Sequence, residues 1–189
     1  MAALAHVAQT APVPDQPSVP VLLFTGPVGV GKSAVAADAS GLLRQAGIPH
    51  ALVDLARIGE GYPAPSADPW HERLAHRNLA CMWSNFQEAG ARRLLLCRVL
   101  EARSLLRYVV RAVPGADITV IRLRAPLPVL HARIRAREAG RDPQWYLDAS
   151  TYLAEKMDRF PVEDYLIDNL DRPAQDVAGE ALRLAGWLP

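Results

Sequence analysis

Short apolar runs alternate with longer stretches of helical periodicity along most of the chain. A continuous apolar run bounded by turn residues is typical of a strand that is buried on both faces of a sheet. Such runs predict strands over 21–25, 51–54, 94–99, 118–123 and 164–168. Apolar residues spaced three or four apart predict helices over 35–46, 68–89, 105–110, 126–139, 144–157 and 173–185. This alternation predicts an α/β fold in which helices cover both faces of a parallel sheet.

The N-terminal segment differs in composition from the rest of the chain. Four prolines occur there among Ala, Val and Gln, namely Pro12, Pro14, Pro17 and Pro20. Because such a segment has few apolar side chains to bury, we expect a flexible tail over 1–19. Residues 20–189 then form a single domain, which suits a chain of 189 residues.

Composition and charge exclude several classes of protein. Lys and Arg number 21 and Asp and Glu number 20, so the net charge is +1, whereas a nucleic-acid-binding domain is normally far more basic. No apolar run approaches the roughly 18 residues that a membrane span needs, and the N-terminus lacks the features of a signal peptide. Two cysteines, Cys81 and Cys97, are too few for a disulfide framework. We expect a cytoplasmic protein with no nucleic-acid or membrane partner, and the oligomeric state stays open.

One motif between the first predicted strand and helix carries a specific chemistry. Residues 26–33 fit the pattern G-x-x-x-x-G-K-[ST], in which a loop cradles a nucleotide phosphate. Its glycines keep side chains away from an anion that backbone N–H groups bind, and the N-terminus of the following helix adds its dipole. Lys32 can reach the β- and γ-phosphates, and the Ser33 hydroxyl can ligate Mg²⁺, so the expected cofactors are ATP and Mg²⁺. The expected phosphate-binding residues are Gly26, Pro27, Val28, Gly29, Val30, Gly31, Lys32, Ser33 and Ala34.

Three features stand in a characteristic order along the chain. The phosphate loop opens the first strand–helix unit, Asp54 ends the second predicted strand, and an arginine-rich helix follows the fourth. Together they resemble the small P-loop kinases, the group that holds adenylylsulfate kinase, gluconate kinase and chloramphenicol phosphotransferase. The resemblance covers residues 20–189. It implies a five-stranded sheet of order 2-3-1-4-5, with a small lid and with ATP at the C-terminal edge of the strands.

Asp54 is the first candidate for a catalytic group. A carboxylate at the C-terminal end of a strand can accept a proton from an attacking hydroxyl or hold Mg²⁺ through water. In the kinases that the chain resembles, an Asp at this place contacts the substrate and often acts as a base; the alternative is an Asp that caps a turn. Adenylylsulfate kinases carry an Asp-Gly-Asp-Asn type of run here, whereas Leu55, Ala56 and Arg57 follow Asp54, which disfavours adenylyl sulfate as the acceptor.

The third predicted strand lacks the acid that many P-loop ATPases place after it to hold Mg²⁺. Arg98 stands there instead, and the nearest acid is Glu101, which is either a substitute or a first-turn helix residue. We expect Arg98 and Arg103 to be solvated surface arginines rather than acceptor contacts. The missing acid argues against a mechanical ATPase.

The helix over 126–139 carries the candidate lid arginines. Arg133 and Arg137 are four residues apart and share a helix face, where two guanidinium groups can offset the charge of a transferring phosphoryl group. Gly140 and Pro143 mark a break at which a lid can hinge. The resemblance implies that this helix supplies catalytic lid arginines; the alternative is an exposed helix face.

Two further segments are candidates for ligand contacts. Arg172, in the loop after the fifth strand, can stack on a nucleotide base, although a plain connecting loop is the alternative. The stretch 57–70 is long for an α/β connection and contains Tyr62 and Trp70, so it either receives the acceptor or is a surface loop that these aromatics anchor.

These observations together predict an enzyme. We expect an ATP- and Mg²⁺-dependent phosphotransferase that acts on a hydroxyl of a small molecule, with Lys32, Asp54, Arg133 and Arg137 in catalysis and Ser33 on the metal. The alternatives are a P-loop NTPase that works as a switch or with a regulating partner, and a nucleotide-binding module that has lost catalysis.

Overall fold

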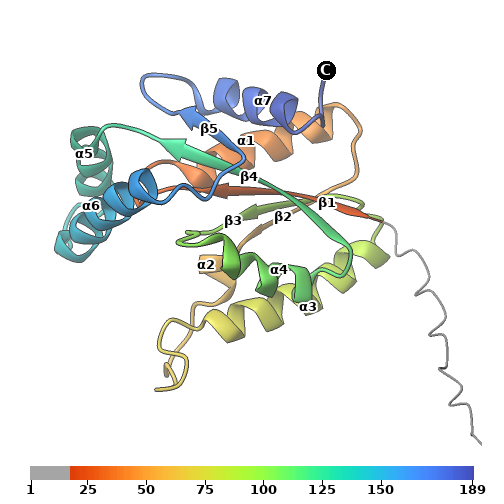
Figure 1. Ribbon diagram of the computed structural model, residues 1–189, viewed down its shortest axis with the longest axis horizontal. Coiled ribbons are helices and arrows are strands. Elements are labelled where there is room, and N and C mark those ends of the chain that lie inside the picture. Colours follow the sequence, from red (N-terminus) through yellow and green to blue (C-terminus); the bar gives the residue numbers. More distant parts are fainter. Residues whose placement is uncertain (1–17) are drawn as a thin grey trace, which may run out of the picture.

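A parallel five-stranded sheet forms the centre of the computed structural model, which describes residues 18–189 (Figure 1). The strands are β1 (Val19–Thr25), β2 (Ala51–Asp54), β3 (Leu94–Cys97), β4 (Ala116–Arg124) and β5 (Tyr165–Asp168). Their order across the sheet is β2-β3-β1-β4-β5, which confirms the order that the resemblance implies. Most of the expected tail, 1–17, lies outside the described residues. Because β1 begins at Val19, the domain starts one residue earlier than expected.

Helices cover both faces of the sheet and extend beyond its C-terminal edge (Figure 1). One face carries α1 (Lys32–Gln45) and α7 (Ala174–Leu184). The other carries α2 (Leu55–Ile58), α3 (Glu72–Glu88), the 3₁₀ turn η1 (Arg103–Leu105) and α4 (Leu106–Ala112). The pair α5 (Leu127–Arg137) and α6 (Gln144–Arg159) packs together near the strand ends. No helix among residues 18–189 is long and apolar enough to cross a membrane.

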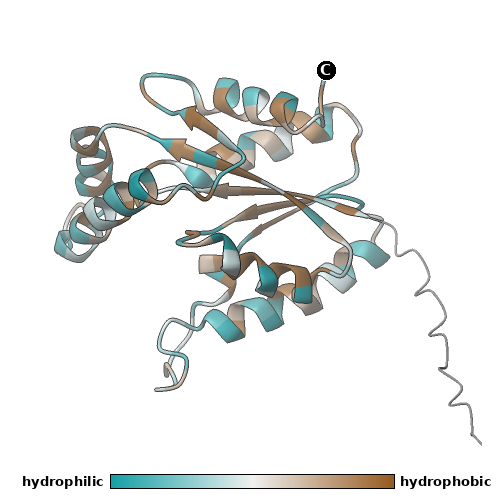
Figure 2. Ribbon diagram, viewed as in Figure 1, coloured by the Kyte–Doolittle hydropathy of each residue, from teal (hydrophilic) through white to brown (hydrophobic). Residues whose placement is uncertain are grey.

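Strand residues alternate between two hydrophobic cores, one on each side of the sheet. Leu22 and Phe24 of β1 join the core under α1 and α7, whereas Leu23 joins the core under α3 and α4, where Trp83 is fully buried. Figure 2 shows the resulting distribution: the central strands are largely hydrophobic, β4 includes polar stretches, and the helices are of mixed character. Burial on both faces explains why the strands read as continuous apolar runs.

The structure differs from the sequence expectation at the start of α3. Its first residue is Glu72, three residues later than a helix that begins with Pro69. Asp68 still caps the helix, because its Oδ2 accepts hydrogen bonds from the N–H groups of Arg73 (3.1 Å) and Leu74 (3.2 Å). His71 adopts a left-handed backbone conformation (φ 51°) and turns the chain into the helix. The expected N-cap position was therefore wrong, since His71 takes it, but Asp68 still satisfies two N–H groups in the first turn.

Candidate functional site

The phosphate loop connects β1 to α1 and depends on glycine at two points of close approach. Gly26 has φ 137°, and a Cβ there would lie 2.5 Å from the Leu123 carbonyl oxygen. Gly29 has φ 84°, and a Cβ there would lie 2.9 Å from the Leu130 carbonyl oxygen of α5. Both positions exclude other residues by conformation and by space. The loop is thus held tightly against β4 and α5.

Two buried polar side chains hold the outer side of the loop. Ser150 of α6 donates a hydrogen bond from its hydroxyl to the Val28 carbonyl (2.8 Å), and Asn169 donates from its amide to the Val30 carbonyl (2.7 Å). Since a peptide plane carries its C=O and N–H on opposite sides, these bonds turn the following N–H groups away from Ser150 and Asn169. Sequence reasoning missed both residues; the only signal for Ser150 was a small polar residue on the buried face of a helix, and Asn169 lies in a loop, where no pattern marked it.

The N-terminus of α1 is open to an anion. Its N-cap is Gly31, which offers no side-chain cap, and the first turn contains no acidic residue. The unpaired N–H groups and the helix dipole therefore favour a negatively charged group at this end. Ala34 lies exposed in this first turn, as expected for a residue beside a bound phosphate.

Lys32 bends over the loop that precedes it. Its Nζ donates hydrogen bonds to the carbonyl oxygens of Gly26 (2.9 Å) and Pro27 (3.0 Å). Burial lowers the pKa of Lys32 to about 8, the nearby Asp54 carboxylate opposes this shift, and Arg137 adds to it. Neither hydrogen-bond partner is a carboxylate, so an incoming phosphate can supply the charge partner that the ammonium lacks.

Ser33 and Asp54 meet across the gap between α1 and β2. The Ser33 hydroxyl donates a hydrogen bond to Asp54 Oδ2 (2.7 Å). Asp54 Oδ1 accepts a second bond from the Ala56 N–H (3.1 Å), so the same carboxylate also caps the short helix α2. The two readings of Asp54, as a cap and as a site residue, are therefore compatible.

Asp54 lies at the same height along the sheet as the end of β3, the strand after which many P-loop ATPases carry an acid. It is in register with Cys97, the last residue of β3, whose Sγ lies 3.8 Å from the Lys32 carbonyl oxygen. Cys97 is buried, and burial raises the pKa of its thiol to about 12, so it stays protonated. In this chain a carboxylate is found at the end of β2, whereas those ATPases carry one at the end of the third strand.

Ser33 and Asp54 could together supply oxygen atoms to a Mg²⁺ ion. Within residues 18–189 no group of three or more His, Cys, Asp or Glu side chains could hold a metal ion by itself. Mg²⁺ is usually held by one or two protein oxygens together with water and substrate phosphates, because it dehydrates reluctantly. One hydroxyl and one carboxylate, 2.7 Å apart at the mouth of the phosphate loop, fit that requirement.

Arg98 was expected to be a solvated surface residue, and this expectation was wrong. Its side chain is only 6% exposed, and its guanidinium donates to Glu72 Oε2 (3.1 Å) and to His76 Nε2 (2.9 Å). Burial lowers the pKa of His76, and the charge of Arg98 lowers it further, so the ring is neutral and accepts this bond.

Glu101, the acid nearest to the end of β3, has a partner within the chain. Its carboxylate accepts a hydrogen bond from Lys156 Nζ of α6 (2.6 Å).

The two candidate lid arginines lie on α5 but contact different partners. Arg133 donates to the carbonyl oxygen of Asn169 (3.0 Å), in the loop after β5. Arg137 donates to Glu138 (2.7 Å) and lies 5.0 Å over the ring of Tyr146. Arg137 is close enough to Lys32 for its charge to lower the lysine pKa. Arg133 is therefore beside the loop that follows β5, whereas Arg137 is beside Tyr146 of α6.

Arg172 is engaged with the protein rather than projecting freely from its loop. Its Nη2 donates to Glu180 Oε2 (2.6 Å) of α7, and its Nη1 donates to the Asp168 carbonyl (3.3 Å). These contacts fix the guanidinium beside Asn169, which supports the phosphate loop. A contact between Arg172 and a nucleotide base stays a prediction.

The aromatics of the 57–70 stretch do not anchor it to the domain body. Tyr62 is 98% exposed and Trp70 is 72% exposed. Trp70 instead stacks on Trp145, the second residue of α6, at a ring-centroid distance of 6.2 Å and an interplanar angle of 29°. The loop after Asp54 thus contacts the lid helices.

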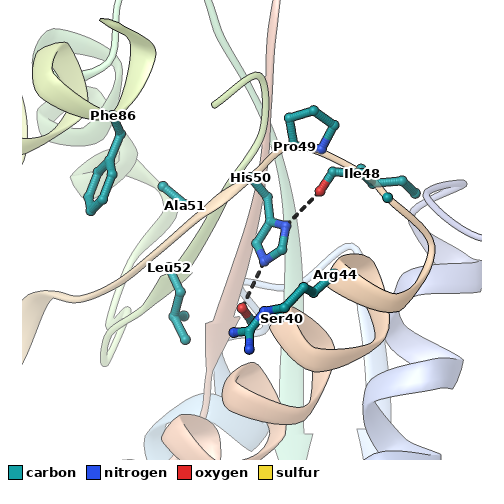
Figure 3. A pocket seen from close by; sticks show the side chains of 9 residues that line it. Ser40, Arg44, Ile48, Pro49, His50, Ala51, Leu52 and Phe86 are labelled. Carbon is teal, nitrogen blue, oxygen red and sulfur yellow. Dashed lines mark hydrogen bonds between the residues drawn. The ribbon is translucent and has the colours of Figure 1, made fainter. Parts of the chain in front are cut away.

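A separate hollow of about 450 Å³ lies at the opposite end of the sheet, where α1 leads into β2 (Figure 3). His50 lies between two partners there, with Ser40 Oγ 2.7 Å from Nε2 and the Ile48 carbonyl oxygen 2.7 Å from Nδ1. Both ring nitrogens are occupied within the chain. This hollow lies at the N-terminal end of β2, at the opposite strand ends from the phosphate loop, so it is not part of the candidate site.

Comparison with known proteins bears on the fold. No protein-family model matches the chain, and no curated protein matches it. Solved structures do match. The Deinococcus radiodurans tunicamycin resistance protein is 20% identical with a TM-score of 0.65, and the match covers 90% of this chain and 97% of that protein.

Two kinases show the same likeness. A gluconokinase from Sinorhizobium meliloti is 20% identical, with a TM-score of 0.54 and coverage of 90% of this chain and 92% of that one. The APS kinase of Mycobacterium tuberculosis, in complex with AMPPNP and APS, is 20% identical, with a TM-score of 0.57 and coverage of 90% and 99%. At this level of identity the likeness establishes the fold: the chain has the fold of the small P-loop kinases.

Proposed function

We propose that this protein is a Mg²⁺-dependent phosphotransferase that moves the γ-phosphoryl group of ATP to a hydroxyl of a small molecule. The observation that carries the proposal is the direct hydrogen bond between Ser33 and Asp54 beside Lys32. It joins a phosphate loop to a carboxylate at one sheet edge, which is the combination that phosphoryl transfer needs. Structures of the same fold include a gluconokinase, a sugar kinase and a shikimate kinase in complex with shikimate, which supports a small acceptor.

Binding of the triphosphate would use the loop and α1. The N–H groups between Gly26 and Gly31 and the N-terminus of α1 donate to the phosphate oxygens, and Lys32 supplies a full positive charge. Lys32 must exchange its two carbonyl partners for phosphate oxygens, and this exchange returns the ammonium to an anionic partner. Ser33 would ligate Mg²⁺ directly and Asp54 would hold it through water, so the carboxylate stays able to take a proton; Mg²⁺ neutralises charge on the β- and γ-phosphates when it is bound.

Transfer then needs one proton acceptor and one phosphoryl acceptor. The acceptor oxygen forms a bond to the γ-phosphorus while the bond from that phosphorus to the bridging oxygen of ADP breaks, and ADP leaves with the bonding electron pair. The proton of the acceptor hydroxyl passes to Asp54. Asp54 is available for this because it is half-buried at the C-terminal end of β2 and is not part of the core.

Three arginines would contact the nucleotide, two of them on α5 and the third in the loop after β5. Arg137 would offset the charge that spreads over the transferring group. Arg133 and Arg172, both tied to the loop after β5, would flank the nucleotide base with their planar faces.

ADP release in the presence of a panel of hydroxyl compounds tests the proposal. A kinase shows slow ATP hydrolysis alone and much faster ADP release with the right acceptor, in a reaction that Lys32→Ala abolishes. Acceleration only by a macromolecular partner would favour the switch-type NTPase instead.

A further inference from the structure

Two exposed tryptophans from distant parts of the chain touch each other. Trp70 is 72% exposed and Trp145 is 58% exposed, although tryptophan is among the residues that are mostly buried in folded proteins. Their rings are 6.2 Å apart at 29°, which lies at the loose end of the stacking range. The two indoles together present adjoining apolar surface to solvent, and contiguous exposed apolar surface is common at ligand-binding sites.

The pair brings together the loop between α2 and α3 and the N-terminal end of α6. Trp145 contacts Tyr146 edge to face at 4.9 Å, and Arg137 lies over the Tyr146 ring at 5.0 Å. Ser150, on the same helix α6 as Trp145, donates a hydrogen bond to the Val28 carbonyl of the phosphate loop (2.8 Å). Trp70 stands near the end of the loop that joins α2, the short helix after Asp54, to α3. The two indoles therefore connect the α2–α3 loop, which follows Asp54 in sequence, to α6, which follows Arg137 in sequence.

We infer that Trp70 and Trp145 form an aromatic subsite for the acceptor, and that the acceptor carries a flat aromatic ring near the hydroxyl that is phosphorylated. The inference rests on the proposed function and names the substrate class of that site. Two indole faces at a small interplanar angle suit a planar ring, which stacks on both or replaces one of them. The two carboxylates nearest to Trp70 in sequence already have partners within the chain: Asp68 Oδ2 accepts from N–H groups of α3, and Glu72 Oε2 accepts from Arg98.

This inference is tested with pairs of probe compounds, in which one member of each pair carries a flat ring and the other carries a methyl group in its place. Full-length protein with Mg²⁺ and AMPPNP is titrated with phenyl β-D-glucoside against methyl β-D-glucoside, and with uridine against methyl β-D-ribofuranoside. Binding is followed by calorimetry and by tryptophan emission, in which the buried Trp83 and Trp187 give a constant background. At least one ring-bearing probe should bind about tenfold more tightly than its methyl partner and quench the emission. Equal binding within both pairs would overturn the inference.

Variants then assign the preference to the two indoles. Trp70→Leu and Trp145→Leu should each remove most of the tenfold ring preference, while Trp70→Phe and Trp145→Phe, which keep a ring, should retain part of it. Phe160→Leu is the matched control, because Phe160 is 57% exposed at the far end of α6. A ring preference that survives both leucine variants would contradict the assignment.

The outcome is separable from that of the proposed function. AMPPNP affinity is measured in the same samples and should be unchanged in all five variants. If the nucleotide fails to bind the parent protein, the proposed function fails, whatever the ring probes do. If the nucleotide binds and saturated hydroxyl compounds are phosphorylated with no ring preference, the kinase stands and the aromatic subsite is overturned.

Discussion

The hydroxyl of Ser33 and the carboxylate of Asp54 form a 2.7 Å hydrogen bond, although 21 residues separate them in sequence. This bond links the end of the phosphate loop to the end of β2. Asp54 is held in place from the other side by the Ala56 N–H, so the carboxylate is fixed before any ligand arrives. Preorganisation of this kind means that the carboxylate pays little entropy when it meets metal or acceptor.

Lys32 should couple ATP binding to proton uptake. Burial lowers the pKa of the free lysine to about 8, whereas bound phosphates favour its charged form and raise the pKa again. At pH 8 a fraction of the lysine is neutral and must take up a proton on binding, so affinity should fall as pH rises through 8. Calorimetry in two buffers of different ionisation enthalpy measures this uptake. Equal heats in both buffers, or uptake that persists in Lys32→Ala, would contradict the assignment.

Gly29→Ala should weaken ATP binding by distorting the loop. The new Cβ would lie 2.9 Å from the Leu130 carbonyl oxygen at a φ of 84°, so the loop must shift away from α5. A shift of about 1 Å at a positioning element can cost about 10²-fold in activity. ATP affinity by calorimetry and thermal unfolding both report the change.

Gly41→Ala is the matched control for this substitution. Gly41 lies within α1, and a Cβ there meets nothing within 4 Å. Alanine is favoured over glycine in a helix by about 1 kcal/mol, so this variant should unfold at a higher temperature and bind ATP normally. A loss of ATP affinity in both variants would point to a general effect rather than to the loop.

Arg137→Ala should lower turnover by about 10²-fold if the guanidinium offsets charge in the transition state. ATP affinity should change much less, because the loop and Lys32 remain. Arg135→Ala is the control, since Arg135 is exposed on the same helix and points elsewhere. Steady-state kinetics with an active acceptor separates kcat from KM. Equal effects of the two substitutions would remove Arg137 from the mechanism.

The sequence was sufficient for the fold and for the phosphate loop, because both follow from local patterns. Continuous apolar runs mark strands buried on both faces, and the loop motif fixes its residue types at fixed spacing. Asp54 could be placed at the site because a parallel sheet brings the C-terminal ends of its strands to one edge.

Other site features depend on contacts that no local pattern encodes. Ser150 and Asn169 bond to loop carbonyls 122 and 139 residues away in sequence. The burial of Arg98 follows from its partners on α3, and the contact of Trp70 with Trp145 follows from how the loop and the lid helices meet. Such contacts form only when distant elements pack together.

The rate of acceptor-dependent ADP release by Asp54→Asn tests the central claim most directly. Asparagine is nearly isosteric and is also a good helix cap, so the variant should fold and bind ATP as the parent does. It cannot accept the acceptor proton, and the acceptor-dependent rate should fall by about 10²–10⁴-fold. An unchanged rate with an acceptor that the parent phosphorylates would show that Asp54 only caps α2, and would contradict the mechanism proposed for this site.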